Sequence, residues 1–544
     1  MHTICKVFPT VSTFVPCPDL PNRAGCCWLR PVTTGCPDPP TPEDTHAPRR
    51  SEVFPAPRDQ PQLPANGANN STTSDKRPAT SAKSNRRQFL DTTTATVAGA
   101  ALAGVAATKA GAQEKADVPK VFAGGSDAIR LALIGCGGRG GGAAADALSV
   151  QGAPLKLVAM ADVFKERADI VRRSIGEQFE GKFDVPDERV FVGFDAYKEA
   201  IDYLKPGDIA IFATPVAFRA PHFAYAIEKG VHTFMEKPVS VDGPSTKRII
   251  ELAKKADEKN LKVGVGLMCR HCDRRRELYD RLQNGEAGEL MDFRGYRMHT
   301  PAQSPELFPG PPEGVSEILW QIRRFHGFLW ASGGIYSDYY VHHIDEVCWM
   351  KGAWPVTAEA TGGRHVKGKM DDQNFDSYAV EYTFPDGTKF FYSGRHIKNC
   401  DQKFGVFGRG TKGAFTISAS GHSPARCAIY KGQAEDKDKL LWTADQPEPN
   451  PYRREWEHLV DAIINDKPYN EAVRGAEASL ATAMGRIAAH TGKLVTYDGL
   501  LNGDYDLTAG VADFKADSPA PVRLLADYTY PVPSPGKFKY EYND

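Results

Sequence analysis

The sequence lacks an excess of charge of either sign, and it lacks any uninterrupted apolar run of the roughly 20 residues that a membrane-spanning helix needs. Its 67 basic and 68 acidic residues leave a formal net charge of -1 over 544 residues, so no electrostatic feature favours nucleic acid as a partner. Hydrophobic residues at 41% and charged residues at 25% exclude collagen, coiled-coil and fully disordered chains. The chain is therefore predicted to be mostly globular, with three or four domains by length alone.

Proline and cysteine are concentrated at one end, because fifteen of 40 prolines and five of 11 cysteines fall in the first 80 residues. This stretch has no useful helical or strand periodicity, and its composition cannot bury enough apolar surface to offset chain entropy. A small disulfide module is the alternative, which the odd cysteine count and the proline density disfavour. Residues 1–83 are predicted to be a disordered leader or the result of a misassigned start codon.

The next segment, residues 84–112, resembles a twin-arginine export signal. It combines paired arginines before an apolar pair, a weakly apolar stretch and a small-x-small cleavage pattern, at 86–90, 92–107 and 110–112. We expect export to the periplasm of an already folded protein whose mature chain begins near Gln113. The alternative is a fortuitous arginine pair before an alanine-rich linker.

A short apolar strand, 129–134, leads directly into a glycine-rich turn and an alanine-rich helix. In such a G-x-G-x-x-G motif Gly135 permits a tight turn, Gly137 lets the backbone approach a pyrophosphate, and Gly140 allows the helix to pack closely on the strand. The helix N-terminus also attracts phosphates. The predicted cofactor loop consists of Gly135, Gly137, Gly138, Arg139 and Gly140.

A second strand, 155–161, ends in Asp162, which lies 27 residues after Gly135. A carboxylate there can accept hydrogen bonds from the adenosine ribose hydroxyls and would repel a 2′-phosphate, which favours NAD over NADP. Lys165 and Arg167 lie close enough to leave NADP open. The alternative role for Asp162 is a helix N-cap.

Strand and helix patterns continue to alternate, which predicts an α/β, Rossmann-type, doubly wound parallel sheet. The predicted helices begin at Lys165 and span 197–204, 221–229 and 244–259, and the predicted strands span 208–213, 232–235 and 262–267. Residues 113–268 are therefore predicted to form an NAD(P)-binding domain.

Two short motifs stand at the ends of predicted strands, where such sheets bind ligands: Ala213-Thr214-Pro215, with His222 seven residues on, and Glu236-Lys237-Pro238. An ammonium at Lys237 can hydrogen-bond an oxygen that becomes a carbonyl and can lower the cost of alkoxide character. The alternative is a surface lysine beside a turn proline.

In their order, these motifs resemble the glucose-fructose oxidoreductase/inositol dehydrogenase (Gfo/Idh/MocA) family over about 129–267. The resemblance implies that Lys237 lies beside the nicotinamide and contacts the substrate hydroxyl, with a bond to Pro238 that is often cis. We expect further cofactor contacts from Thr214, Pro215, His222, Glu236 and Lys237.

After Leu267 the pattern changes to longer alternating strands, which predicts an α+β domain, 269–503, with an open, largely antiparallel sheet. The resemblance implies that this sheet is also used for oligomer contacts, so a homodimer or homotetramer is expected. Helices over 453–465 and 474–491 could pack back on the core, and 504–544 is interpreted as an extended arm that could clasp an oligomer. The predicted strands span 291–299, 377–384, 388–396, 404–408, 413–418 and 428–430.

Residues 333–345 carry the pattern G-G-x-x-x-D-x-x-x-H-x-x-D on a predicted helix. Asp338 and His342 are four apart and share a helix face, and an imidazole beside a carboxylate can accept a proton near neutral pH. The family resemblance implies that His342 is the general acid/base, that Asp338 is its partner or a substrate ligand, and that Asp345 is structural. A satisfied structural histidine is the alternative for His342. His343, about 100° away on the helix, is the competing histidine and a substrate-binding candidate.

Two features depart from the family pattern. The long segment 301–330 is rich in aromatic residues, which could stack on a sugar or form a lid, or could build a small local core. Cys269 and Cys272 are predicted to be structural thiols rather than a disulfide or a metal site, and no metal is predicted. Arg270, between them, is a candidate to face the cofactor or substrate.

The sequence therefore predicts an NAD(P)-dependent oxidoreductase acting on a secondary hydroxyl of a sugar, polyol or glycoside, with a cofactor that is tightly bound and recycled. The neutral charge balance suits a neutral carbohydrate. The alternative is an NAD-dependent glycoside hydrolase or lyase that oxidises C3 transiently; such relatives carry a Tyr-x-Thr-His-Gly-type segment, which is missing after Tyr336. A non-catalytic, NAD-bound sugar sensor is a third class.

Overall fold

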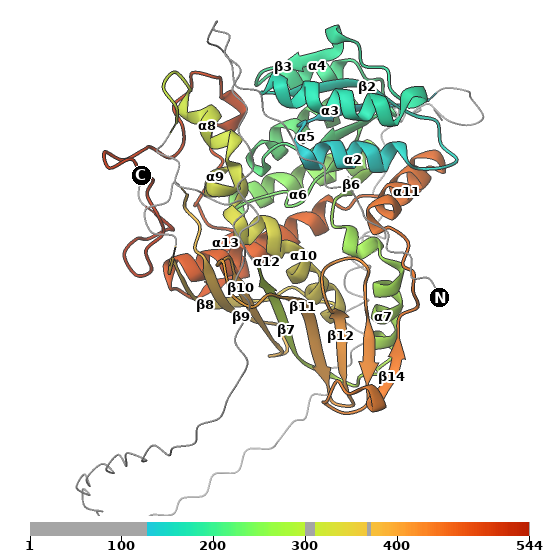
Figure 1. Ribbon diagram of the computed structural model, residues 1–544, viewed down its shortest axis with the longest axis vertical. Coiled ribbons are helices and arrows are strands. Elements are labelled where there is room, and N and C mark those ends of the chain that lie inside the picture. The colour runs from blue at the N-terminus through green and yellow to red at the C-terminus, as the bar shows by residue number, and fades with distance from the viewer. Residues whose placement is uncertain (1–127, 300–310, 367–371, 543–544) are drawn as a thin grey trace, which may run out of the picture. The chain divides into compact units, whose positions relative to one another are not determined.

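The computed structural model describes residues 128–299, 311–366 and 372–542 (Figure 1). The predicted leader and export signal, together with Phe308 of the aromatic segment, lie outside these residues. None of the helices in the described ranges combines the length and the apolar character that crossing a bilayer requires.

The first sheet has six parallel strands in the order β3-β2-β1-β4-β5-β6, which confirms the doubly wound sheet. The order reverses direction between β1 and β4, and ligands bind at such a switch point. The continuous apolar runs predicted as strands are buried because helices cover both faces of the sheet. The strands are β1 (Ile129–Ile134), β2 (Leu155–Asp162), β3 (Val190–Val192), β4 (Ile209–Phe212), β5 (His232–Met235) and β6 (Val263–Val265).

One face of this sheet packs against α2, α3 and α11, and the other against α4, α5, α6 and part of α12. The two late helices therefore return to the first sheet: the Trp456 ring of α11 stacks on Phe234 of β5 with centroids 4.3 Å apart. The helices are α2 (Gly138–Leu148), α3 (Lys165–Gln178), α4 (Ala196–Asp202), α5 (Arg219–Glu228), α6 (Gly243–Glu258), α11 (Pro451–Ile464) and α12 (Ala472–Thr491).

The second sheet has nine strands in the order β14-β13-β12-β11-β7-β10-β9-β8-β15. All neighbours are antiparallel except β7 and β10, so the prediction of an open, largely antiparallel sheet is confirmed. The strands are β7 (Leu290–Met298), β8 (Thr357–Gly363), β9 (Ser377–Thr383), β10 (Lys389–Arg395), β11 (Lys403–Gly410), β12 (Ala414–Ser418), β13 (Ala428–Tyr430), β14 (Leu440–Thr443) and β15 (Val495–Thr496).

Helix α10 (Gly334–Lys351) carries the D-x-x-x-H pattern and packs on the second sheet and on α12. It begins three residues earlier than the predicted Ser337, and Gly333 and Gly334 at its start both adopt a positive φ of 72°, which residues with a side chain disfavour. Fifteen of its 18 residues are buried, so side chains on most of its surface meet other elements.

The aromatic segment builds the small local core that was one of its predicted roles, and stacking on a sugar or forming a lid stays a prediction. It forms α8 (Glu317–Arg323) and α9 (Leu329–Ser332), and it buries Phe328 and Trp330 completely in a local core, whereas Phe325 lines a cavity at the carboxyl ends of the first sheet's strands. The other short helices are α7 (Asp273–Gln283) and α13 (Tyr497–Leu501).

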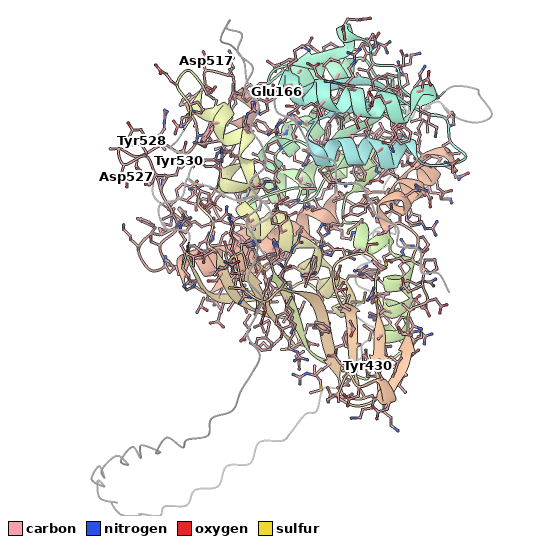
Figure 2. All side chains as sticks on the ribbon, in the orientation of Figure 1. Glu166, Tyr430, Asp517, Asp527, Tyr528 and Tyr530 are labelled. Atoms are coloured by element: carbon pink, nitrogen blue, oxygen red, sulfur yellow. The ribbon has the colours of Figure 1, made fainter. Side chains whose placement is uncertain are left out.

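The C-terminal segment, 504–542, packs on its own chain beside α8 and α9 (Figures 1 and 2). Tyr530 is 1% exposed and meets the Phe328 ring, whereas Tyr528, labelled close by in Figure 2, is 66% exposed. The predicted arm is therefore part of the fold, and its suggested role in clasping an oligomer stays a prediction.

Candidate functional site

The glycine-rich loop has close packing on one side and open space on the other. A Cβ added at Gly140 would lie 1.9 Å from the Gly135 carbonyl oxygen, so only glycine lets α2 approach the end of β1. A Cβ added at Gly137 or Gly138 would meet no described atom within 4 Å. This open cradle of backbone amides before a helix N-terminus suits a pyrophosphate.

Asp162 ties the end of β2 to this loop. Its carboxylate accepts hydrogen bonds from the backbone N–H of Cys136 (2.6 Å) and of Phe164 (2.9 Å). The N-cap residue of α3 is Phe164, so Asp162 does not cap that helix from the N-cap position. The remaining acceptor capacity of the carboxylate faces the cavity, as a ribose ligand requires.

A cavity of about 680 Å³ opens at the carboxyl ends of β1, β2, β4 and β5. Of the predicted cofactor residues, only Gly140 is not part of its lining, because it packs behind the loop on Gly135. The predicted residues that line the cavity are Gly135, Gly137, Gly138, Arg139, Asp162, Thr214, Pro215, His222, Glu236 and Lys237.

The end of β4 is held by buried polar groups. Arg219 donates to the carbonyl oxygens of Phe212 (2.7 Å) and Thr214 (3.1 Å), and His222 Nδ1 lies 3.4 Å from the Thr214 hydroxyl. Burial and the neighbouring Arg219 lower the pKa of His222 to about 3, so the imidazole is neutral at physiological pH. His222 therefore acts here as an aromatic wall of the cavity that also orients Thr214.

Arg139 and Glu236, predicted separately as cofactor residues, form an ion pair with Nε and Oε1 2.6 Å apart. The Arg139 guanidinium also lies over the Tyr452 ring of α11, 4.8 Å from its centroid. The pair joins the glycine-rich loop to the end of β5, and so fixes the two sides of the cavity relative to each other.

Lys237 connects the two domains. Its peptide bond to Pro238 is cis, as the family resemblance implied. Its Nζ donates to the Asp338 carbonyl oxygen at 2.7 Å and lies 3.2 Å from the Asp338 carboxylate. The ammonium predicted to meet the substrate is thus held by the first turns of α10.

The Asp338 carboxylate is shared between Lys237 and His326. Its second carboxylate oxygen lies 3.0 Å from His326 Nε2, in the turn between α8 and α9. Burial raises the pKa of the Asp338 carboxyl, but Lys237 and His326 outweigh burial and hold that pKa well below its ordinary value. His326 also lines the cavity and was missed by the sequence analysis, because nothing in its local sequence marks it.

His342 lies one helical turn beyond Asp338 but does not pair with it. No hydrogen bond between the two is present among the described residues, because the Asp338 carboxylate is engaged by Lys237 and His326. His342 instead packs against the ring of His422, with centroids 4.5 Å apart, and its buried Nδ1 has no hydrogen-bond partner in the described chain. Burial, His422 and Lys237 lower the pKa of His342 far below its ordinary value, so a neutral imidazole is available to accept a proton.

Two predicted substrate residues are not brought to the cavity. The completely buried His343 points into the second sheet, where its Nδ1 lies 3.1 Å from the Tyr392 hydroxyl. Arg270 forms a bidentate ion pair with Asp345, with a shortest distance of 2.7 Å. Asp345 is therefore the ion-pair partner of Arg270, which agrees with the structural role predicted for Asp345.

Cys269 and Cys272 are both buried and free, so they form no disulfide. Cys269 does approach Glu346 and His422, with one ligand atom of each within 4.8 Å of the others. Two guanidiniums border this group, since Arg275 lies 3.4 Å from Glu346 and Arg297 lies 3.3 Å from His422 Nε2. Because a guanidinium can only donate, His422 Nε2 accepts from Arg297, and the ring proton lies on Nδ1, which is directed to Glu346. This arrangement suits an ion-pair network rather than a metal site.

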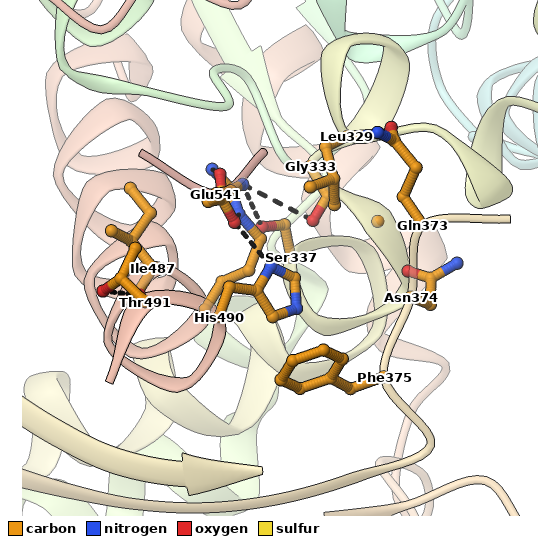
Figure 3. A network of polar contacts seen from close by, with 12 residues as sticks. Leu329, Gly333, Ser337, Gln373, Asn374, Phe375, Ile487, His490, Thr491 and Glu541 are labelled. Carbon is orange, nitrogen blue, oxygen red and sulfur yellow. Dashed lines mark hydrogen bonds and ion pairs between the residues drawn. The ribbon is translucent and has the colours of Figure 1, made fainter. Parts of the chain in front are cut away.

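The start of α10 is anchored by the end of the chain (Figure 3). The fully buried Glu541 pairs with Arg486 at 2.9 Å and with His490 at 2.6 Å, both on α12. Arg486 in turn donates to Ser337 Oγ at 3.1 Å and contacts the Gly333 carbonyl oxygen at 3.4 Å. The C-terminal segment thus helps to set the position of Asp338 and His342.

Comparison with known proteins assigns the first domain. Residues 129–267 match the model of an oxidoreductase family with an NAD-binding Rossmann fold, GFO_IDH_MocA. The match has the same bounds as the region that carries the glycine-rich loop, the strand-end Asp162 and Lys237. The first domain is an NAD-binding Rossmann domain.

Sequence identity to two individual proteins is 29% or less. An inositol 2-dehydrogenase from Corynebacterium glutamicum is 29% identical over 152 residues, 28% of this chain and 37% of that protein. A glycosyl hydrolase family 109 protein from Shewanella pealeana is 26% identical over 269 residues, 46% of this chain and 54% of that protein. The chain thus spans well under two thirds of the length of these two relatives.

Among solved structures, aldose-aldose oxidoreductase from Caulobacter crescentus, complexed with glycerol, superposes with a TM-score of 0.52 at 17% identity. The superposition covers 68% of this chain and 100% of that one. At this identity the likeness supports the two-domain fold.

Proposed function

We propose that the protein is an NAD-dependent oxidoreductase that oxidises a secondary hydroxyl of a sugar, polyol or glycoside. The observation that carries this proposal is the position of Lys237, whose ammonium borders the NAD cavity and is held by Asp338 of α10. His342 lies one helical turn beyond Asp338 and supplies a neutral imidazole, although it is not among the residues that line the cavity. The match to an oxidoreductase family supports the same activity.

The cofactor site fits NAD, because the open cradle at Gly137 and Gly138 and the carboxylate of Asp162 lie in one cavity. When bound, NAD would supply the hydride acceptor. The carboxylate of Asp162 disfavours a 2′-phosphate, although Arg167, which also lines the cavity, keeps NADP open.

The chain's own residues then have distinct roles. Lys237 donates a hydrogen bond to the substrate oxygen and stabilises negative charge on it, and His342 accepts the hydroxyl proton. Asp338 orients the Lys237 ammonium, while His326 contacts the other oxygen of that carboxylate. Ile322 of α8 and Phe325 of the turn that follows it form part of the cavity wall, where apolar surface would limit access of water to the reacting end.

The test is to denature the purified protein and assay the released nucleotide, and then to follow NADH formation with a panel of sugars and polyols. Released NAD with no need for added cofactor would support a tightly bound, recycled nucleotide. Turnover that Lys237→Ala abolishes would support the dehydrogenase; an NAD-bound sensor would show no turnover in either protein.

A redox-assisted glycoside hydrolase or lyase is the second candidate, and the likeness to a glycosyl hydrolase family 109 protein favours it. Both activities would use a hydride acceptor, but they differ in product. Cleavage of an aryl glycoside without net NADH would support the second candidate, whereas a keto-sugar with stoichiometric NADH would support the first.

We further propose, from the twin-arginine resemblance, that the protein is exported to the periplasm, and that it forms a homodimer or homotetramer through the second sheet. Retention of an Arg86→Lys, Arg87→Lys double variant in the cytoplasm would test export. Light scattering of the purified protein would give the oligomer size.

A further inference from the structure

Several cations near the reacting end of the site are paired with carboxylates, whereas Arg219 donates to backbone carbonyl oxygens instead. Lys237 pairs with Asp338 and Arg270 with Asp345. Arg275 pairs with Glu346. Arg297 of β7 has no carboxylate within ion-pair distance among the described residues. A partly buried guanidinium without an anion is costly unless a ligand supplies one.

Arg297 is held rigidly. Its guanidinium lies over two aromatic rings, 5.0 Å from the centroid of Tyr339 and 4.8 Å from that of Phe404. One terminal nitrogen donates to the Tyr339 carbonyl oxygen at 2.6 Å and lies 3.3 Å from His422 Nε2. These contacts leave the second terminal nitrogen without a partner in the described chain. A planar donor fixed in this way can bind a carboxylate without losing further rotamer freedom.

Arg297 is also close to the groups assigned to the reaction. It is bonded to the backbone of Tyr339, the residue that follows Asp338 and lines the cofactor cavity. Through His422 it is one ring away from His342, the proposed proton acceptor. The positive charges of Lys237 and Arg297 both help to lower the pKa of His342.

We propose that Arg297 binds a carboxylate of the substrate, so that the oxidised alcohol belongs to a sugar acid, a uronate or an aldonate, and not to a neutral polyol. This inference rests on the proposed dehydrogenase function. Arginine forms paired hydrogen bonds with a carboxylate, which a hydroxyl cannot match in strength. The near-zero net charge of the whole chain is compatible with an acidic substrate, because substrate binding depends on the local charge beside the reacting carbon.

The experiment compares acids with their neutral counterparts on the NAD-loaded holoenzyme. The probes are galacturonate against galactose, glucuronate against glucose, and gluconate against sorbitol, followed by NADH formation and by titration calorimetry. The variants are Arg297→Gln, which removes the charge, and Arg297→Lys, which keeps the charge without the planar fork. Arg294→Gln is the matched control, since Arg294 lies on the same strand with its side chain on the opposite face of the sheet.

We expect at least one acid to have a higher kcat/KM than its neutral counterpart. Arg297→Gln should raise the KM for that acid roughly 10- to 100-fold, as loss of a charge-assisted hydrogen-bond pair predicts. It should leave the KM of the neutral counterpart within about threefold, and Arg297→Lys should recover part of the loss. The control Arg294→Gln should change neither KM.

Equal or better turnover of the neutral compounds would overturn the inference while the dehydrogenase function stands. An equal loss for acid and neutral compounds in Arg297→Gln would also overturn it, because a merely structural Arg297 predicts that result. Absence of all turnover would instead contradict the proposed function. In that case calorimetry still decides the inference: acid binding that Arg297→Gln abolishes supports it, and no acid binding by the wild-type protein overturns it.

Discussion

The two ends of the site are built in different ways. At the cofactor end, the cavity is lined by the glycine-rich loop and by residues directly after strands, such as Gly137 and Asp162. At the α10 end, the contacts come from side chains far apart in the chain, since Lys237 meets Asp338 at a separation of 101 residues. His422 and Arg297 meet at a separation of 125 residues.

This difference explains which predictions were reliable. Where the backbone binds the ligand, a short motif contains most of the site, because glycine spacing fixes the local conformation. Where side chains bind, the partner of each group depends on packing between elements. We therefore expect substitutions far along the chain to affect the α10 end of the site. At the cofactor end we expect only substitutions within the local motifs to have an effect.

The largest effect on kcat is expected from substitution of Lys237 or His342, where the cofactor end and the α10 end of the site meet. Lys237→Met should lower kcat by about 10²- to 10⁴-fold, because the substrate oxygen loses its positively charged donor, while NAD binding stays within a few-fold. His342→Gln should have an effect of similar size through loss of the proton acceptor. His326→Gln should cost less, since His326 acts through Asp338. Steady-state kinetics with NAD titration measure these values.

A loss of NAD affinity in Lys237→Met as large as the loss of kcat would contradict the division of the site. If His326→Gln lowered kcat more than His342→Gln did, the assignment of the proton acceptor to His342 would be wrong.

The second largest effect is expected on the stability of the fold, from substitution of the buried Glu541. Glu541→Gln should lower the free energy of unfolding by roughly 3 kcal/mol, because it leaves Arg486 buried without its charge partner. Burial raises the pKa of the Glu541 carboxyl, but Arg486 and His490 outweigh it and depress that pKa from 4.5 to about 2. A depressed folded-state pKa means that this stability is complete above about pH 4.5 and is lost as the pH falls toward about 2.

Denaturant unfolding of both proteins between pH 7 and pH 2 measures the difference. Glu457→Gln is the control, because the partly exposed Glu457–Arg454 pair should contribute less than about 1 kcal/mol. A pH-independent difference between wild type and Glu541→Gln would show that the charge of Glu541 is not what stabilises the start of α10.

The two loop glycines should separate folding from binding at the cofactor end. Gly140→Ala should destabilise the fold by about 1–3 kcal/mol, because its Cβ would lie 1.9 Å from the Gly135 oxygen. Gly137→Ala should leave the melting temperature unchanged but weaken NAD binding about tenfold, since its Cβ would occupy the open cradle. Thermal unfolding and NAD titration measure both, with Gly181→Ala as an unstrained control. Unchanged NAD affinity in Gly137→Ala would place the phosphates elsewhere.

The smallest effect is expected at Asp162. Asp162→Asn removes the charge that faces the ribose but keeps one acceptor for the backbone N–H groups of Cys136 and Phe164. We expect NAD affinity to fall by a few-fold and the preference for NAD over NADP to shrink by about tenfold, as removal of one repulsive charge predicts. Dissociation constants for both nucleotides test this, and an unchanged ratio would assign the selection to another residue.

Much of the fold could be predicted from local patterns. The strands at 129–134 and 232–235 have the bounds that the apolar runs indicated, and the second sheet is largely antiparallel as expected. Strand β8 was missed, because half-exposed residues in Thr357–Gly363 give no clear alternation. Helix α11 was recognised as a helix, but its place on the Rossmann sheet depends on a stack with Phe234 that lies far away in the chain.

For the site, the sequence by itself determined which groups are present and where the backbone places them. It put Gly137, Asp162 and Lys237 at strand ends, and it put Asp338 and His342 on one face of a helix, because local periodicity dictates these positions. Only the tertiary structure decided the partners. Asp338 pairs with Lys237 and His326 instead of His342, because a side chain four residues away on a helix competes with charges delivered by other elements. The same packing left Arg297 without an anion beside the reacting end, and no local pattern marks that position.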